Sequence, residues 1–188
     1  MPVRPLIPLV AALVLAAPAS SPTGGPTSTP PSARDRLYAS LDGRWSGTLE
    51  YKDYQDSSRR VTLPTTLDVT RSADSSYLTL RFTYDDGPGK TVVQTDRLAL
   101  DASATTLAWG AEKDTARQRF AVRAMTGPPP SQPLRLVLES EGSDDDRPAT
   151  IRKTIAVAPR LLRILKETRP AGSGEFGFRH RYELTRVE

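Results

Sequence analysis

Two lysines and the single histidine of this chain occupy alternate positions within apolar segments. Lys153 is in phase with Ile151 and Ile155, and Lys166 follows Leu162 and Ile164 in the same rhythm. His180 shares its phase with the aromatic side chains around it. Cationic groups on an otherwise apolar face could hold an anionic headgroup such as a carboxylate, while the apolar wall takes a tail. The alternative is that both lysines pair with Asp or Glu, or extend to solvent.

Support for catalysis or metal binding is weak. The chain contains no cysteine, which excludes disulfides, thiolate metal sites and thiol nucleophiles. It has no G-x-S-x-G, P-loop, G-x-G-x-x-G or H-E-x-x-H motif. A Ser-His-Asp triad would have to use His180 with Asp53 or Asp96, and no serine is singled out as its nucleophile. The acidic run 139–146 lacks EF-hand spacing and reads as a solvated loop, so we expect no metal site.

The first nineteen residues have the features of a secretory signal. Arg4 precedes an apolar segment, Leu6 to Ala17, and Ala17-Pro18-Ala19 fits the small-x-small cleavage rule. The apolar segment is too short to cross a bilayer, although an uncleaved anchor is the alternative interpretation. We therefore expect removal of residues 1–19, no membrane span in the mature chain, and a periplasmic or secreted protein. Residues 20–32 contain only Pro, Ser, Thr and Gly and are expected to form a disordered linker.

The charge distribution argues against a nucleic-acid partner. The formal net charge is +4, and the basic residues are dispersed along the chain. No basic stripe is present that could follow a phosphate backbone.

The remainder, residues 33–188, is expected to form one all-β domain. Leu37 and Leu41 lie four apart in 33–41, which predicts a short helix. From Gly43 onward the period changes to two, with turn residues after each segment. The expected strands are 43–54, 59–71, 75–85, 90–101, 104–110, 116–125, 133–141, 147–158, 160–169 and 175–187. Gaps this short permit hairpins and forbid parallel crossovers. Ten such strands favour a closed antiparallel up-and-down barrel, and an open sandwich is the alternative.

The position of a binding site follows from this topology. In an up-and-down barrel, odd strands end at the rim where even strands begin. The inward polar and aromatic residues fall mostly at that rim, whereas inward residues at the other end are aliphatic. Apolar walls with a few convergent polar groups are typical of a ligand cavity. We expect the ligand-binding residues to be Tyr51, Tyr84, Gln94, Trp109, Lys153, Lys166, Phe178 and His180.

The segment Gly43-Arg44-Trp45-Ser46-Gly47, which follows the helix and opens the first strand, resembles the G-x-W signature of lipocalin-like barrels. The resemblance implies that the short helix closes one end of the barrel and that Trp45 packs under an arginine from the far end of the chain. Arg186 occupies the corresponding place on the last strand. Pairing of the first and last strands would then bring Gly43, Trp45 and Arg186 together and set His180 beside Tyr51.

A weaker similarity is to the nitrobindin family of ten-stranded haem barrels, which also open with G-x-W-x-G. It implies a haem ligand on the last strand, where His180 lies, although the rest of the chain does not match. The function we expect is an exported, non-enzymatic barrel that binds a small apolar or amphipathic molecule, without a cofactor. The alternatives are a haem barrel that uses His180, or a barrel enzyme that uses interior residues such as Tyr51 or Lys153.

Overall fold

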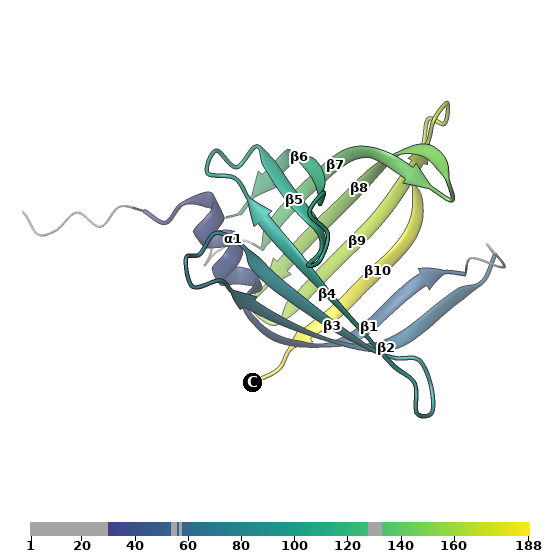
Figure 1. Cartoon of the computed structure of the whole chain (residues 1–188), viewed down its shortest axis with the longest axis horizontal. Coiled ribbons are helices and arrows are strands. Elements are labelled where there is room, and N and C mark those ends of the chain that lie inside the picture. The colour runs from purple at the N-terminus through teal and green to yellow at the C-terminus, as the bar shows by residue number, and fades with distance from the viewer. Residues whose placement is uncertain (1–29, 54–55, 57, 128–132) are drawn as a thin grey trace, which may run out of the picture. The chain divides into compact units, whose positions relative to one another are not determined.

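The protein is a closed antiparallel barrel of ten strands with one short helix (Figure 1). The computed structural model describes residues 30–53, 56, 58–127 and 133–188. The expected signal peptide lies outside the described residues, as does most of the expected linker. The elements are α1 (Ala33–Leu41), β1 (Gly43–Lys52), β2 (Arg60–Arg71), β3 (Leu78–Asp85), β4 (Thr91–Leu100), β5 (Thr106–Ala111), β6 (Gln118–Thr126), β7 (Leu134–Asp144), β8 (Arg147–Ala158), β9 (Leu161–Pro170) and β10 (Gly177–Arg186).

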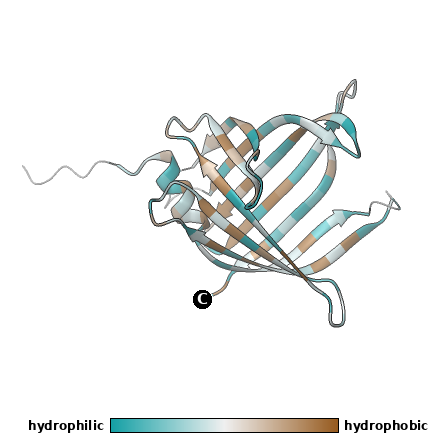
Figure 2. Cartoon of the chain, viewed as in Figure 1, coloured by the Kyte–Doolittle hydropathy of each residue, from teal (hydrophilic) through white to brown (hydrophobic). Residues whose placement is uncertain are grey.

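Alternation along the strands builds the core. In β3 the buried side chains are those of Leu78, Leu80, Phe82 and Tyr84, and the intervening residues are more exposed. Hydrophobic and hydrophilic bands accordingly alternate along the strands (Figure 2). Successive side chains of a strand point to opposite faces, so this two-residue period gives the barrel an apolar interior.

Closure comes from the pairing of β1 with β10. Trp45 lies opposite Arg186, and Tyr51 lies opposite His180. Because β1 also pairs with β2, all ten strands belong to one closed sheet and not to two sheets packed face to face. The expected barrel and both expected pairings are confirmed, and the open sandwich is excluded.

Helix α1 is fastened across one end of the barrel. Ser32, which we had assigned to the linker, instead caps the helix by accepting a hydrogen bond from the Asp35 amide. The Tyr38 hydroxyl accepts from the Leu100 amide and donates to the Ser76 carbonyl, both over 3.1 Å. These bonds tie the helix to the end of β4 and to the segment before β3, while Leu37, Tyr38 and Leu41 are fully buried in the core. No helix among the described residues has the length and apolarity needed to cross a bilayer.

Arg186 completes this end by satisfying the carbonyls at the end of α1. Its guanidinium donates to the carbonyl oxygens of Asp42 (2.6 Å) and Ser40 (2.8 Å), and it lies 4.1 Å above the Trp45 ring. Trp45 in turn donates its indole N–H to the Leu41 carbonyl over 2.8 Å. Gly43 has φ +113°, and a Cβ there would meet the guanidinium at 2.8 Å, so glycine is required at this position.

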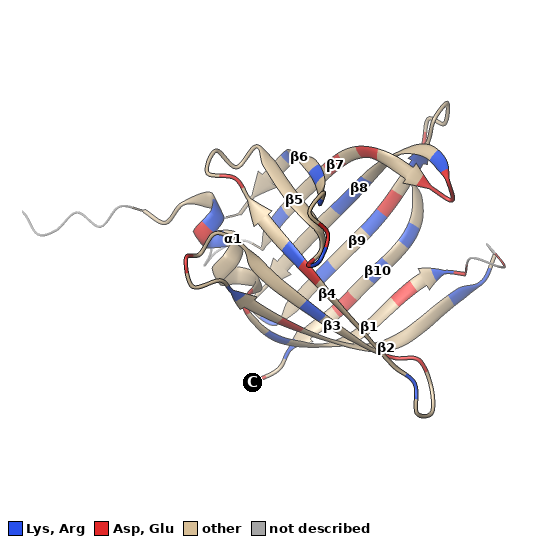
Figure 3. Cartoon of the chain, in the orientation of Figure 1, with Lys and Arg blue, Asp and Glu red and all other residues tan. Residues whose placement is uncertain are grey.

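Charges on the outer surface are balanced by neighbours on adjacent strands. Glu139 binds Arg123 (3.1 Å) and Arg152 (2.7 Å), and Glu50 binds Arg60 (3.2 Å). Figure 3 shows basic and acidic bands interspersed over the barrel strands.

One expected turn proved to be strand. We expected a loop over Gly142 to Asp146, but β7 continues to Asp144, and a turn of only two residues joins it to β8. Asp145 and Asp146 have φ values of 50° and 59°. A two-residue hairpin needs positive φ at both central positions, and aspartate tolerates that conformation better than most residues.

A bulge in β10 reverses the expected facing of Phe178. The register against β9 shifts between Phe178 and His180, so that Phe178 pairs with Glu167 while His180 pairs with Lys166. A one-residue shift exchanges the two faces of a strand. Phe178 therefore packs under the Arg60 guanidinium at 3.7 Å and does not face the interior as we had expected.

We predict that Arg186→Met lowers the free energy of unfolding by about 2–4 kcal/mol, because it removes hydrogen bonds from a charged donor and the contact with Trp45. Urea denaturation measures the change. The control is Arg160→Ala, which breaks only an ion pair between side chains that are 69% and 81% exposed, and should cost at most about 0.5 kcal/mol. Equal stability of the two variants would contradict this role for Arg186.

Candidate functional site

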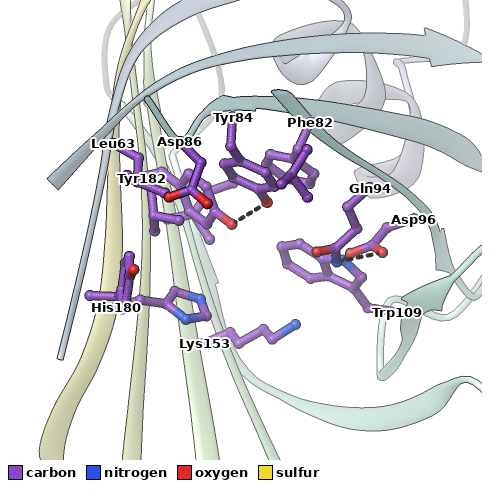
Figure 4. Close-up of a pocket in the computed structure, with 14 residues that line it drawn as sticks. Leu63, Phe82, Tyr84, Asp86, Gln94, Asp96, Trp109, Lys153, His180 and Tyr182 are labelled. Atoms are coloured by element: carbon purple, nitrogen blue, oxygen red, sulfur yellow. Dashed lines mark hydrogen bonds between the residues drawn. The ribbon is translucent and has the colours of Figure 1, made fainter. Parts of the chain in front are cut away.

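A cavity of about 420 Å³ lies inside the barrel, toward the end away from α1. Its lining residues are Leu49, Tyr51, Leu63, Phe82, Tyr84, Asp86, Val92, Gln94, Asp96, Trp109, Lys153, Ile164, His180 and Tyr182 (Figure 4). Val92, at the start of β4, is 44% exposed, so the cavity reaches the surface at this rim. The volume is within the range of about 300–1,000 Å³ that is usual for small-molecule sites.

The structure brings six of the eight expected ligand-binding residues to this cavity. They are Tyr51, Tyr84, Gln94, Trp109, Lys153 and His180. Phe178 is outside, because of the bulge in β10. Lys166 does not line the cavity, although it is paired in register with both Lys153 and His180.

Lys153 rests against aromatic rings rather than against a carboxylate. Its Nζ lies 3.8 Å from the centre of the Trp109 ring and 5.1 Å from that of Phe120. Within the described part of the chain, the amine forms no hydrogen bond and no ion pair. Burial, with the neighbouring Lys166 as a further cause, lowers the pKa of Lys153 to about 7, and Asp96 partly opposes the shift.

Asp96 is a buried acidic group that we had not placed among the ligand-binding residues. It is 6% exposed, and its two carboxylate oxygens accept hydrogen bonds from Gln94 (3.0 Å) and the Trp109 indole N–H (2.9 Å). These bonds fix the orientation of the Trp109 ring on which Lys153 rests. The signal was present in the sequence, since Asp96 shares the inward phase of Gln94 and Leu98.

Two tyrosines from strands that are not adjacent in the barrel meet in the cavity. The hydroxyls of Tyr84 on β3 and Tyr182 on β10 are 2.9 Å apart. Phe82 packs on Tyr182 with ring centres 5.0 Å apart, which makes this wall aromatic. Burial raises the pKa of Tyr84 to about 12, so its hydroxyl remains a neutral hydrogen-bonding group.

His180 is held as a neutral imidazole. Burial lowers its pKa to about 3, with Lys166, Lys153 and Arg179 as additional causes. Its ring packs edge-on against Tyr182 at 5.5 Å, and Figure 4 shows it beside the Lys153 side chain. A neutral imidazole can ligate haem iron, but haem also needs apolar space in front of the ligand. The same cavity contains the amine of Lys153, whose Nζ lies over the Trp109 ring, so the residues fit haem only in part.

Arg179 is a further cation that sequence reasoning missed. The bulge places it beside the β7–β8 turn, where it binds Asp144 (2.9 Å) and Asp145 (3.0 Å), and its side chain is only 12% exposed. The described residues include no group of three or more His, Cys, Asp or Glu side chains placed to hold a metal ion.

Comparison with known proteins found no matching family model and no matching curated protein. The likeness to lipocalin-like barrels therefore rests on the closed ten-stranded fold, the short helix and the contact of Trp45 with Arg186.

We predict that Lys153→Met stabilises the protein, and more so at pH 7 than at pH 9. The folded-state pKa is below the unfolded value, so between about pH 7 and 10 the unfolded chain binds more protons. Stability of the parent protein therefore rises with pH in this window, and the advantage of the variant should shrink by about 1–3 kcal/mol between pH 7 and 9.

Urea denaturation at several pH values tests this. Lys113→Met, at an exposed position, is the control and should change stability by at most about 0.5 kcal/mol. A constant difference between Lys153→Met and the parent protein across this range would show that the amine is charged and well solvated in the folded state.

Proposed function

We propose that this protein is an exported barrel that binds a small amphipathic molecule in its cavity, without chemical conversion as its main role. The observation that carries the proposal is the cavity of about 420 Å³ in which the amine of Lys153 faces an apolar wall and has no ion-pair partner among the described residues. A buried cation is costly unless something compensates it, so a site of this kind favours a ligand that supplies the missing partner.

The wall accounts for the apolar part of the ligand. Leu49, Leu63, Phe82 and Ile164 come from four different strands and line one cavity. Burial of an alkyl chain against them gains about 0.8 kcal/mol for each methylene group removed from water. This contribution does not depend on the polar group of the ligand. It therefore favours binding of a class of molecules with alkyl chains rather than of one compound.

The polar end of the ligand is best matched by Lys153. A carboxylate placed near its Nζ would favour the ammonium form and raise its pKa from about 7. The hydroxyls of Tyr84 and Tyr182 and the amide of Gln94 provide further hydrogen-bonding groups in the same cavity. A neutral alcohol would gain only these uncharged contacts, so we expect anionic amphiphiles to bind more tightly.

Export is supported by the signal-like segment. N-terminal sequencing of the protein recovered from its own cell envelope or medium tests this part of the proposal. A mature chain that begins at Ser20 is the expected result, and an intact Met1 in the cytoplasm would contradict it.

We predict that decanoate and decanol bind to the purified protein, decanoate more tightly, and that Leu63→Trp weakens both by at least about tenfold because it fills the cavity. Isothermal titration calorimetry measures both affinities. Thr62→Trp is the matched control, since Thr62 is the exposed neighbour on the same strand and should leave binding unchanged.

Two results would overturn the proposal. One is the absence of binding by either decanoate or decanol to a folded protein. The other is equal binding by the Leu63→Trp variant, which would place the ligand outside the barrel.

Haem remains the second candidate because His180 is neutral and faces the cavity. Titration with hemin separates the two functions. We predict no Soret band that depends on His180, since the cavity that the imidazole faces also contains the amine of Lys153. A Soret band that appears with the parent protein and is lost in His180→Ala would show that haem, and not an amphiphile, is the ligand of the cavity.

A further inference from the structure

We infer that Lys153 captures aldehydes or ketones inside the cavity as a reversible Schiff base. The inference deepens the proposed function, on which it rests, by naming the ligand class as amphipathic carbonyl compounds. It depends on the position of the Lys153 amine in the cavity, on the lack of an ion pair to that amine among the described residues, and on the surrounding groups that can carry protons.

The amine is accessible to a ligand and free to react. Lys153 lines the cavity, and its Nζ lies over the Trp109 ring at 3.8 Å. Within the described ranges no carboxylate or carbonyl holds the nitrogen, so its lone pair needs no bond to be broken before attack. The pKa of about 7 leaves roughly half of the amine unprotonated at neutral pH, whereas an ordinary lysine is almost wholly protonated there.

The reaction balances without an oxidant or a second substrate. The nitrogen lone pair attacks the carbonyl carbon, and the carbonyl π electrons move to oxygen, which takes a proton and gives a carbinolamine. Loss of that hydroxyl with a further proton releases water and forms the C=N bond. The two hydrogens of the released water come from the amine, directly or by exchange, and hydrolysis reverses every step.

Groups that could support these steps face the same cavity. The Asp96 carboxylate favours a positive charge on Lys153, and the same field would favour a protonated imine. Its orientation is fixed by Gln94 and Trp109. The hydroxyls of Tyr84 and Tyr182, joined by a hydrogen bond of 2.9 Å, are donors and acceptors through which a proton can pass.

The other four lysines lack this combination. Lys90 is ion-paired with Asp86, which raises its pKa. Lys113 is exposed, and neither Lys52 nor Lys166 lines the cavity. All four are present in the same chain and serve as internal controls for selectivity.

The test is reductive trapping with decanal at pH 7. Cyanoborohydride reduces an imine to a stable secondary amine, which increases the protein mass by that of the aldehyde less one oxygen atom. Peptide mapping over time then gives a rate for each lysine. We expect Lys153 to be labelled at least about tenfold faster than the other four, because it is the lysine that lines the cavity which decanal enters. Its rate should level off above about pH 7–8, whereas the rate at Lys90, whose pKa is raised by Asp86, should continue to rise towards pH 10.

Two variants sharpen the result. Lys153→Arg keeps a cation but cannot form an imine, so the fast phase should disappear. Lys166→Arg keeps the neighbouring charge and should retain the fast labelling of Lys153. If Lys153→Arg does not fold, mapping of the parent protein alone still decides.

Binding of decanol and decanoate is measured in parallel, so that the two proposals can fail separately. Binding of these probes with no preference for Lys153 in the decanal experiment would overturn the Schiff-base inference and leave the proposed function standing. Absence of binding by all three compounds would overturn both.

Discussion

The antiparallel pairing of β10 with β1 is the constraint on which the rest of the structure depends. It joins the last strand to the first, and it delivers Arg186 to the end of α1, where the guanidinium binds the Ser40 and Asp42 carbonyls above Trp45. Without this pairing the helix end would lack partners for its carbonyls, and the sheet would have two open edges. The same register sets His180 beside Tyr51 at the other rim.

The two ends of the barrel therefore have different physical roles. The end covered by α1 is packed with buried leucines and with Tyr38 and Trp45, and it supplies stability in a chain that has no disulfide. The other end contains Lys153, Asp96 and His180 within one cavity, an arrangement that costs free energy of folding. Buried ionisable groups that do not stabilise the fold are typical of binding or catalytic sites.

Sequence reasoning recovered what periodicity and end-to-end pairing determine. Alternation predicted the strands and the barrel, and the G-x-W segment predicted the contact of Trp45 with Arg186. It failed where one residue changes the register, because nothing local in 175–187 marks the bulge that turns Phe178 outward and brings Arg179 against β7. It also left Asp96 out of the ligand-binding residues. A buried carboxylate needs hydrogen-bond donors, and the sequence alone does not show that Gln94 on β4 and Trp109 on β5 both reach this one.

The central claim is that the end of the barrel away from α1 holds a ligand cavity, in which Lys153 binds the polar end of the ligand. A crystal structure of the protein soaked with decanoate brominated at its terminal carbon tests this most directly, because anomalous scattering locates the bromine. The account predicts bromine inside the barrel, near Phe82 or Leu63, with the carboxylate towards Lys153. Bromine found only on the outer surface, with the barrel interior unchanged, would contradict it.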